Sequence, residues 1–411
     1  MELRLERMVH GGVALARLAG GRLVLVSGGI PGELVRGEVE EVSGVLRAEV
    51  AEVLEPSPQR LPKPLHPGLD FGHIEYSRQL ELKHEVVVDA LRRAVRGPQE
   101  LPEVAPVHAA PEQWNYRSAV QPVVVGGRLG YRLPNSDSAV PLDRDPVANE
   151  ALDWAWQEIG RRPSPKGVRE LAMRGNDRGE TLLALVATSP QRTLLSYAHD
   201  LVRDGVAGVT YARFDARGRF RGGSSRLAGE RRIRQVYGDF EVSVSVTSFA
   251  QPNPAAAGEL YRQLRQVAGS GGMALELFAG SGIIALHLAN SFLQVEAVEI
   301  DRASVSRGSA DAKRLGIDNI SFQPGDVRDA LIHPEVELIA VDPPRAGLGR
   351  QTREAIEHSS ADRLIYVSCD PATWARDVAQ FVAGGWRLEL AQPYDFYPHT
   401  HHVEILSLLS R

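Results

Sequence analysis

Cysteine is almost absent from this sequence, since Cys369 is the only one among 411 residues. A chain with one cysteine forms no internal disulfide. It also lacks the cysteines that a zinc finger or an iron–sulfur cluster requires. A lone cysteine is commonly a small buried side chain. Any chemical role for Cys369 therefore has to be argued from the residues around it.

Long apolar runs are also absent. No stretch reaches eighteen apolar residues, and the N-terminal segment MELRLERMVHGG carries charges where a signal peptide needs an apolar segment. We therefore expect a cytoplasmic protein without a membrane partner. A length of 411 residues predicts two or three domains, each with its own hydrophobic core.

Lysine is scarce, because only four of the 47 basic side chains are lysines, and the net charge of −5 is spread unevenly. The segment 213–234 holds eight arginines against two carboxylates. Such a segment favours phosphate contacts, whereas a solvated arginine-rich loop is the alternative that charge alone leaves open. The arginines predicted to contact the phosphates of a substrate are Arg217, Arg219 and Arg221.

Four parts can be distinguished along the chain. Residues 1–56 read as short strands separated by glycines, which predicts a small OB-like β-barrel. Residues 57–69 are proline-rich and predict a linker, and residues 70–240 predict a mixed α/β domain with a helix near 76–95. Residues 241–411 alternate strand, loop and helix, which is typical of a doubly wound, mostly parallel α/β sheet. Two closing strands without a helix between them should pair antiparallel.

The first chemical motif is LELFAGSG over residues 275–282, a strand that runs into a glycine loop. Gly280 and Gly282 let the backbone turn tightly and approach a nucleotide-like ligand. Glu299 ends the next strand, where a carboxylate accepts hydrogen bonds from ribose hydroxyls. The loop lacks the spacing of the dinucleotide fingerprint. On these residues alone, nicotinamide dinucleotides and S-adenosylmethionine both fit.

A second motif, Asp342-Pro-Pro-Arg345, directly follows the apolar strand VELIAV. Two prolines stiffen a loop at the carboxyl end of a strand, where doubly wound folds bind ligands. A rigidly placed polar group beside a flat base suits a base-modifying enzyme. Adenine N6 methyltransferases carry an aromatic residue after the prolines, where this chain has Arg345.

The third motif places Cys369 between a strand and a helix, in Ser-Cys-Asp-Pro. Asp370 suits the N-cap of that helix and Pro371 suits its first turn. A thiol at the positive end of a helix is expected to have a lowered pKa and to remain accessible. We therefore predict that Cys369 is a nucleophile.

The fourth motif is His401-His402-Val403-Glu404, predicted at the start of the closing strand. Successive strand residues point to opposite faces and no further ligand cluster is visible, so we predict no metal site. Glu404 lies on an apolar strand, where a carboxylate is costly to bury unless it has a task. Accepting a proton is such a task.

Taken together and in this order, FAGSG, VEID, VDPPRAGL, SCDPATWARD and HHVE resemble the RNA uracil-5 methyltransferase family. SFAQPN, residues 248–253, matches that family's Phe-x-Gln-x-Asn segment. The N-terminal part resembles a TRAM domain through Gly12, the strand LVLV and Pro31-Gly-Glu. The resemblance implies a Rossmann-like class I methyltransferase domain. The residues that it places around S-adenosylmethionine and the base are Gln251, Phe278, Glu299, Asp326, Asp342 and, for the substrate, Arg345.

The resemblance implies methylation of C5 of a uracil in RNA, with Cys369 adding to C6 and Glu404 as the general base. Ribosomal RNA is favoured, because TRAM-like domains usually accompany that branch, and transfer RNA is the alternative. An RNA cytosine-5 methyltransferase is the nearest enzymatic competitor, although its nucleophile typically follows threonine or proline. A non-catalytic RNA-binding protein is the alternative from another class. We expect a monomer.

One departure from the family concerns metal. Many bacterial members hold a [4Fe–4S] cluster through four cysteines near the linker and the central domain. The corresponding stretch here, LPKPLHPGLDFGHIEYSRQL, has no cysteine. The chain thus resembles the branch without a cluster, and we expect S-adenosylmethionine as the only cofactor.

Overall fold

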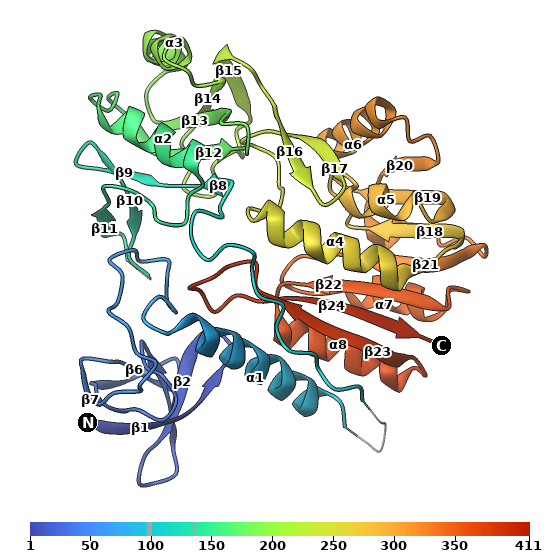
Figure 1. Cartoon of the computed structure of the whole chain (residues 1–411), viewed down its shortest axis with the longest axis horizontal. Coiled ribbons are helices and arrows are strands. Elements are labelled where there is room, and N and C mark those ends of the chain that lie inside the picture. The colour runs from blue at the N-terminus through green and yellow to red at the C-terminus, as the bar shows by residue number, and fades with distance from the viewer. Residues whose placement is uncertain (97–100, 135) are drawn as a thin grey trace.

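The computed structural model describes residues 1–96, 101–134 and 136–411. Figure 1 shows a β-rich N-terminal part, a green central part and an orange-red part that contains the C-terminal sheet. Within the described ranges, no helix combines the length and apolarity that crossing a membrane requires.

The N-terminal part is a sheet of seven strands in the order β5-β6-β3-β2-β1-β4-β7. Alternation along the first strand buries Leu3 and Leu5 beneath it, as period-two patterning requires. The β-rich domain predicted from the sequence is therefore present. Its strands are β1 (Glu2–Val9), β2 (Val13–Arg17), β3 (Leu23–Ser27), β4 (Leu34–Arg36), β5 (Val39–Val42), β6 (Val45–Glu49) and β7 (Glu52–Glu55).

The helix predicted near residues 76–95 is α1 (Tyr76–Ala94). Its buried Val87 and Leu91 share one hydrophobic cluster with Trp374 of α8 (Pro371–Ala383), so α1 packs on the C-terminal part. Figure 1 shows α1 passing beside α8.

The central part contains a sheet of eight strands with α2 (Glu150–Gly160) and α3 (Leu195–Arg203). Its order is β11-β10-β9-β12-β13-β14-β15, with β8 pairing with β12. The strands are β8 (Ala119–Val120), β9 (Val123–Val125), β10 (Arg128–Arg132), β11 (Ala139–Pro141), β12 (Val168–Gly175), β13 (Thr181–Ala187), β14 (Gly208–Arg213) and β15 (Ser224–Gly229); the short helix η1 is Gln191–Leu194.

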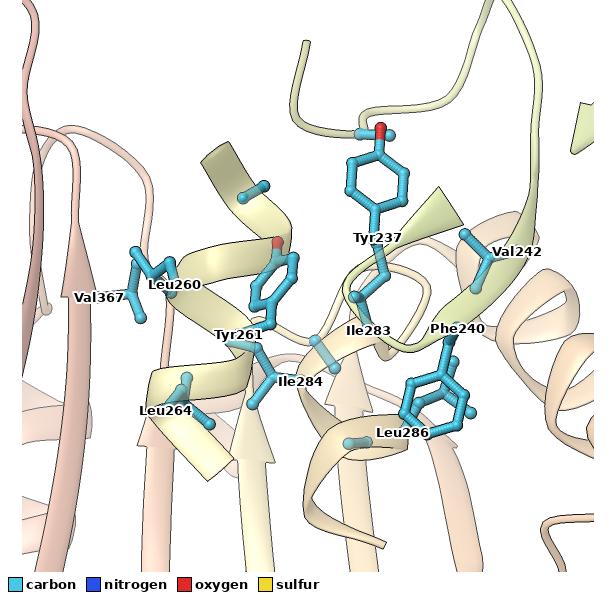
Figure 2. Packing of buried hydrophobic residues seen from close by; sticks show 14 of the residues in the cluster. Tyr237, Phe240, Val242, Leu260, Tyr261, Leu264, Ile283, Ile284, Leu286 and Val367 are labelled. Carbon is cyan, nitrogen blue, oxygen red and sulfur yellow. The ribbon is translucent and has the colours of Figure 1, made fainter. Parts of the chain in front are cut away.

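A two-stranded hairpin joins the central part to the C-terminal part. Its strands β16 (Ile233–Tyr237) and β17 (Phe240–Val244) pack with α4 (Pro254–Ala268) and α5 (Ile283–Leu288) in one hydrophobic cluster. Figure 2 shows Tyr237, Phe240 and Val242 of the hairpin beside side chains of these helices. The predicted boundary at residue 240 lies inside this hairpin.

The C-terminal sheet has the order β20-β19-β18-β21-β22-β24-β23. Its first five strands are parallel, and β24 pairs antiparallel with both β22 and β23, which confirms the predicted topology. The register places Ser368 of β22 opposite Ile405 of β24. The elements are β18 (Gly271–Leu277), β19 (Phe292–Glu299), α6 (Arg302–Leu315), β20 (Ile320–Pro324), η2 (Val327–Asp329), β21 (Val336–Val341), α7 (Arg350–Glu357), β22 (Arg363–Ser368), β23 (Arg387–Tyr394) and β24 (Glu404–Ser410).

Candidate active site

The loops that follow β18, β19, β21 and β22 converge on one cavity of about 800 Å³. Carboxyl ends of parallel strands meet at one edge of a sheet, so motifs far apart in sequence become neighbours there. A volume of this size is within the range of small-molecule and cofactor sites in proteins. Predicted site residues that line it are Gln251, Phe278, Gly280, Glu299, Asp326, Asp342, Arg345, Cys369 and Glu404.

Gly282 does not line the cavity but shapes the loop beside it. It is the N-cap of α5 with φ +72°, and a Cβ built there would lie 2.4 Å from the ring of Phe322. Phe278 also adopts a positive φ of 62°, which is uncommon for a bulky residue. The loop therefore has the tight turn that the sequence predicted, and Gly282 is a structural residue of the site.

Glu299 organises the glycine loop from the neighbouring strand. Its two carboxylate oxygens accept hydrogen bonds from the backbone N–H groups of Gly280 (2.9 Å) and Asp301 (2.8 Å). A carboxylate has about four acceptor positions, so two remain for the hydroxyls of a ribose.

Asp326 is placed at the cavity but already has a partner. Arg328 donates to both of its oxygens, from Nε to Oδ1 at 3.0 Å and from Nη2 to Oδ2 at 2.6 Å, and this pairing holds the pKa of Asp326 low, at about 2. Asp326 also caps the short helix η2 through the N–H of Arg328. It remains an anion at neutral pH and faces the cavity beside Val327.

Asp342 is the only carboxylate of the rigid proline loop. Burial raises its pKa from 3.8 to about 7, although part of the side chain faces the cavity. A carboxyl group with a pKa raised by desolvation favours the protonated form in the folded chain. A ligand with positive charge or hydrogen-bond donors would stabilise the ionised form.

We expect Asp342→Asn to stabilise the free protein at alkaline pH. Because the pKa of Asp342 is raised, its contribution to stability is complete below pH 3.8 and is lost as the pH rises through about 7. Asparagine does not ionise, so the variant should gain about 2 kcal/mol over the natural chain at pH 8, after allowance for water in the cavity, and nothing at pH 4.

Urea unfolding at the two pH values measures this difference. Asp318→Asn is the matched control, because Asp318 is exposed on a loop. A gain that is equal at both pH values, or that the control shares, would contradict the assignment.

Cys369 lies at the end of β22, immediately before α8. Asp370 caps α8 by accepting from the N–H groups of Ala372 (3.1 Å) and Thr373 (2.9 Å), with Pro371 in the first turn, as predicted. The expected lowering of the thiol pKa is wrong for the free protein. Burial and the neighbouring carboxyl groups raise the pKa of Cys369 to about 11.

Glu404 is the first residue of β24 and is 2% exposed. Among the described residues, its Oε2 has no hydrogen-bond partner. Burial and nearby Asp342 raise the pKa of Glu404 well above its usual value. A buried carboxyl group with a raised pKa is a strong proton acceptor once it is ionised.

The two histidines before Glu404 are in a loop and not in the strand, so the expectation that they point to opposite faces is wrong. Their rings lie 4.1 Å apart at 45°. Asp70 binds Nδ1 of His401 at 2.5 Å, and Arg345 approaches His402. The same loop is also held at its first residue, Asp395, which accepts a hydrogen bond from buried Lys83 of α1 at 2.6 Å.

Sequence reasoning missed several side chains that line the cavity. Glu276 is fully buried and accepts from the N–H of Ala285 at 2.8 Å, and burial raises its pKa. A carboxylate inside an apolar strand is the signal that drew attention to Glu404, and it was present here too. Tyr397 donates to Gln251 Oε1 at 3.4 Å, and no local pattern marks it. Tyr261 and Ser304 are among the other lining residues that were missed.

The predicted phosphate-binding arginines lie in the loop between β14 and β15, and none of the three belongs to the described lining of the cavity. Arg217 pairs with Asp215 of the same loop. Arg219 has a structural task, because it binds the nearly buried Glu170 at 2.7 Å. Arg221 is exposed.

If this loop holds RNA phosphates, the double replacement Arg217→Gln/Arg221→Gln should weaken binding of all RNAs alike. Arg219 is left intact to spare Glu170. Each lost contact with a single strand should flatten the slope of log affinity against log salt by about 0.7. Arg387→Gln, an exposed arginine on β23, is the control. A solvated loop instead predicts the same slope as the unchanged protein.

The cavity suits S-adenosylmethionine as a ligand. Glu276, Asp342 and Glu404 are carboxyl groups whose pKa burial raises, so a positively charged sulfonium would relieve an unfavourable environment for their ionised forms. Glu299 beside the glycine loop offers acceptors for a ribose.

Comparison with known proteins agrees with this arrangement. The family model described as tRNA (Uracil-5-)-methyltransferase matches residues 235–324 and 329–411. An RNA methyltransferase from Thermosynechococcus vestitus, named as uncharacterised, is 31% identical over 100% of this chain and 98% of its own length. A similarly named protein from Gloeobacter violaceus is 30% identical over 98% of this chain and 95% of its own length.

A solved structure shows the same fold over the full length. The tRNA (uracil-54, C5)-methyltransferase of Pyrococcus abyssi, in complex with S-adenosyl-L-homocysteine, superposes with a TM-score of 0.79 at 22% identity and covers 100% of both chains. The predicted α/β class with a β-rich N-terminal part is confirmed. The chain belongs to the RNA uracil-5 methyltransferase family and is an enzyme that uses S-adenosylmethionine.

Proposed function

We propose that this enzyme methylates C5 of a uridine in ribosomal RNA through a covalent bond between Cys369 and C6 of the base. The observation that carries the proposal is the meeting of Cys369, Asp342 and Glu404 in the cavity that also contains the glycine loop. These side chains come from three strands of one sheet. A nucleophile, a base-orienting carboxyl group and a proton acceptor are the groups that the reaction needs.

Uracil C5 is a weak nucleophile, which explains the need for a thiolate. The sulfur of Cys369 forms a bond to C6, and the C5–C6 π electrons move toward C5 and O4. S-adenosylmethionine supplies the methyl group on a positively charged sulfur. After C5 has gained the methyl group, the Glu404 carboxylate removes the C5 proton, the C5–C6 double bond returns and Cys369 leaves.

Asp342 and Gln251 are proposed to orient the uracil. Gln251 is buried beside Tyr397, so its amide is held in place, and Asp342 is fixed by two prolines. Protonated Asp342 donates to a carbonyl oxygen and ionised Asp342 accepts from N3–H. Arg345 at the rim is proposed to contact the substrate. The base has to leave any stack to reach Cys369, so we expect a single-stranded or extruded uridine.

The proposed division of labour assigns RNA positioning to residues 1–56 and 70–240, joined by the linker 57–69, and chemistry to residues 241–411. Ribosomal RNA is preferred because a TRAM-like N-terminal part accompanies that branch. Transfer RNA is the second candidate. The matched family model and the Pyrococcus abyssi protein both carry that substrate in their names, and the latter matches over the full chain.

Mass-spectrometric mapping of 5-methyluridine tests the proposal. RNA from cells with and without the gene is separated into ribosomal and transfer fractions before digestion. Loss of 5-methyluridine from ribosomal RNA alone supports the proposal. Loss from transfer RNA alone would show that transfer RNA is the substrate instead. Loss of 5-methylcytidine instead would show that the enzyme methylates cytosine and not uracil.

A further inference from the structure

Among the residues that the structure describes, three side chains line both the main cavity and a small crevice of about 70 Å³ beside it: Arg345, Cys369 and His402. The turn between β1 and β2 closes the far side of this crevice. A Cβ built at Gly12 of that turn would lie 2.6 Å from the Cβ of His401. The three shared side chains therefore form the partition between the crevice and the cavity that holds the chemistry.

Arg345 lies on the face of the His402 ring. Its Nη2 is 3.4 Å from both Nδ1 and Nε2 of His402. An atom in the plane of the ring and equally far from both nitrogens would collide with the carbon between them. The equal distances therefore indicate stacking, in which a planar guanidinium rests on the π face.

The imidazole is suited to carry a cation because it stays neutral. Burial, together with the charges of His401 and Arg345, lowers the pKa of His402 to about 3. On its other sides, His402 meets the rings of His401 and Tyr397, with centroid separations of 4.1 and 5.7 Å. The ring is thus fixed from several directions.

Cys369 lies in an acidic environment. Glu404, Asp342 and Asp370 each raise the pKa of its thiol, and Arg345 lowers it. The other charged residues described at the lining of the crevice are already paired, and Tyr397 beside His402 stays neutral. Lys83 is bound to Asp395, His401 to Asp70 and His10 to Asp370, and burial keeps Tyr397 protonated.

We propose that Arg345, stacked on His402, is the counter-charge of the Cys369 thiolate, and that His402 is a positioning residue that acts through Arg345. This inference rests on the proposed nucleophilic role of Cys369. The carboxyl groups needed for the base and for proton removal work against the thiolate. A guanidinium held at a fixed place offsets them without needing a proton.

The rate at which iodoacetamide alkylates the enzyme tests the inference. The thiolate displaces iodide from the reagent and its proton goes to solvent. Because Cys369 is the only cysteine, the label reports one site. The rate is measured from pH 7 to 10.5 without RNA, by mass spectrometry of the intact protein.

Arg345→Gln should slow alkylation about tenfold at pH 8 and move the pH profile to higher pH, because a nearby opposite charge favours the ionised thiol. His402→Ala should also slow alkylation, by about threefold, because Arg345 loses the ring on which it stacks. His402→Phe keeps a flat ring and should restore the natural profile. A variant that merely unfolds would react faster at pH 8, because a free thiol ionises near pH 8.5.

If the pH profile of alkylation is unchanged in Arg345→Gln, Arg345 is not the counter-charge of the Cys369 thiolate. If His402→Phe reacts like His402→Ala, the ring at this position does not hold Arg345 in place, and the proposed role of His402 is wrong. The nucleophile is tested separately, by measuring turnover of Cys369→Ala. Slowed alkylation in Arg345→Gln together with measurable turnover by Cys369→Ala would retain the counter-charge and reject the proposed covalent mechanism.

Discussion

Replacing Cys369 by alanine is expected to reduce methyl transfer below about one thousandth of the natural rate, because without the thiolate C5 never becomes nucleophilic. Transfer of a labelled methyl group to RNA measures the loss. Binding of S-adenosylmethionine should change by less than about threefold. The groups expected to bind its nucleoside, Gly280 and Glu299, belong to other strands.

Calorimetric titration of S-adenosylmethionine checks that the variant has kept its cofactor site. Cys369→Ser serves as a second variant, since it retains a polar group of similar size but a far weaker nucleophile. Measurable turnover by Cys369→Ala would sink the covalent mechanism. Lost cofactor binding would instead show that Cys369 supports the fold of the cavity.

Replacing Glu404 by glutamine is expected to stop the reaction one step later. Attack by Cys369 and methylation of C5 proceed, but no carboxylate removes the C5 proton, so the enzyme should remain bound to its RNA. The covalent complex should appear as a slow band in denaturing electrophoresis and approach one RNA per enzyme. Turnover should fall at least about a hundredfold, the scale of a lost general base.

The double variant Cys369→Ala/Glu404→Gln is the control and should give no slow band. Stability provides a further check. Glutamine lacks the charge that burial disfavours, so Glu404→Gln should unfold at the same or a higher urea concentration than the natural chain at pH 8. An inactive, folded variant without any adduct would assign Glu404 to an earlier step.

Local motifs predicted the loops of the site well, for a physical reason. Gly280, Asp342 and Cys369 each follow an apolar strand, and parallel strands bring their carboxyl ends to one edge. The cap of α8 was equally readable, because Asp370 and Pro371 act on their own helix. Short-range rules therefore predicted the position of Cys369 at the sheet edge.

Long-range pairs could not be predicted in this way. The thiol pKa depends on Glu404 and Asp342, which come from other strands, so a rule based on the helix alone gave the wrong direction. The buried pair Lys83–Asp395 joins residues 312 positions apart. Arg219 looked like a free arginine in the sequence, and only the fold reveals its bond to Glu170.

The register of β24 sets the spacing between the two groups proposed to be catalytic, Cys369 and Glu404. Ser368 faces Ile405 across the ladder, so Cys369 and Glu404 are the next residues out on adjoining strands. A second ladder pairs Glu404 with Tyr394 of β23, which locks the strand from its other side. A slip of one residue would turn Glu404 away and present an apolar neighbour instead. The spacing of Cys369 and Glu404 is thus as stable as the sheet: warming the enzyme should leave their alignment intact until the whole sheet unfolds.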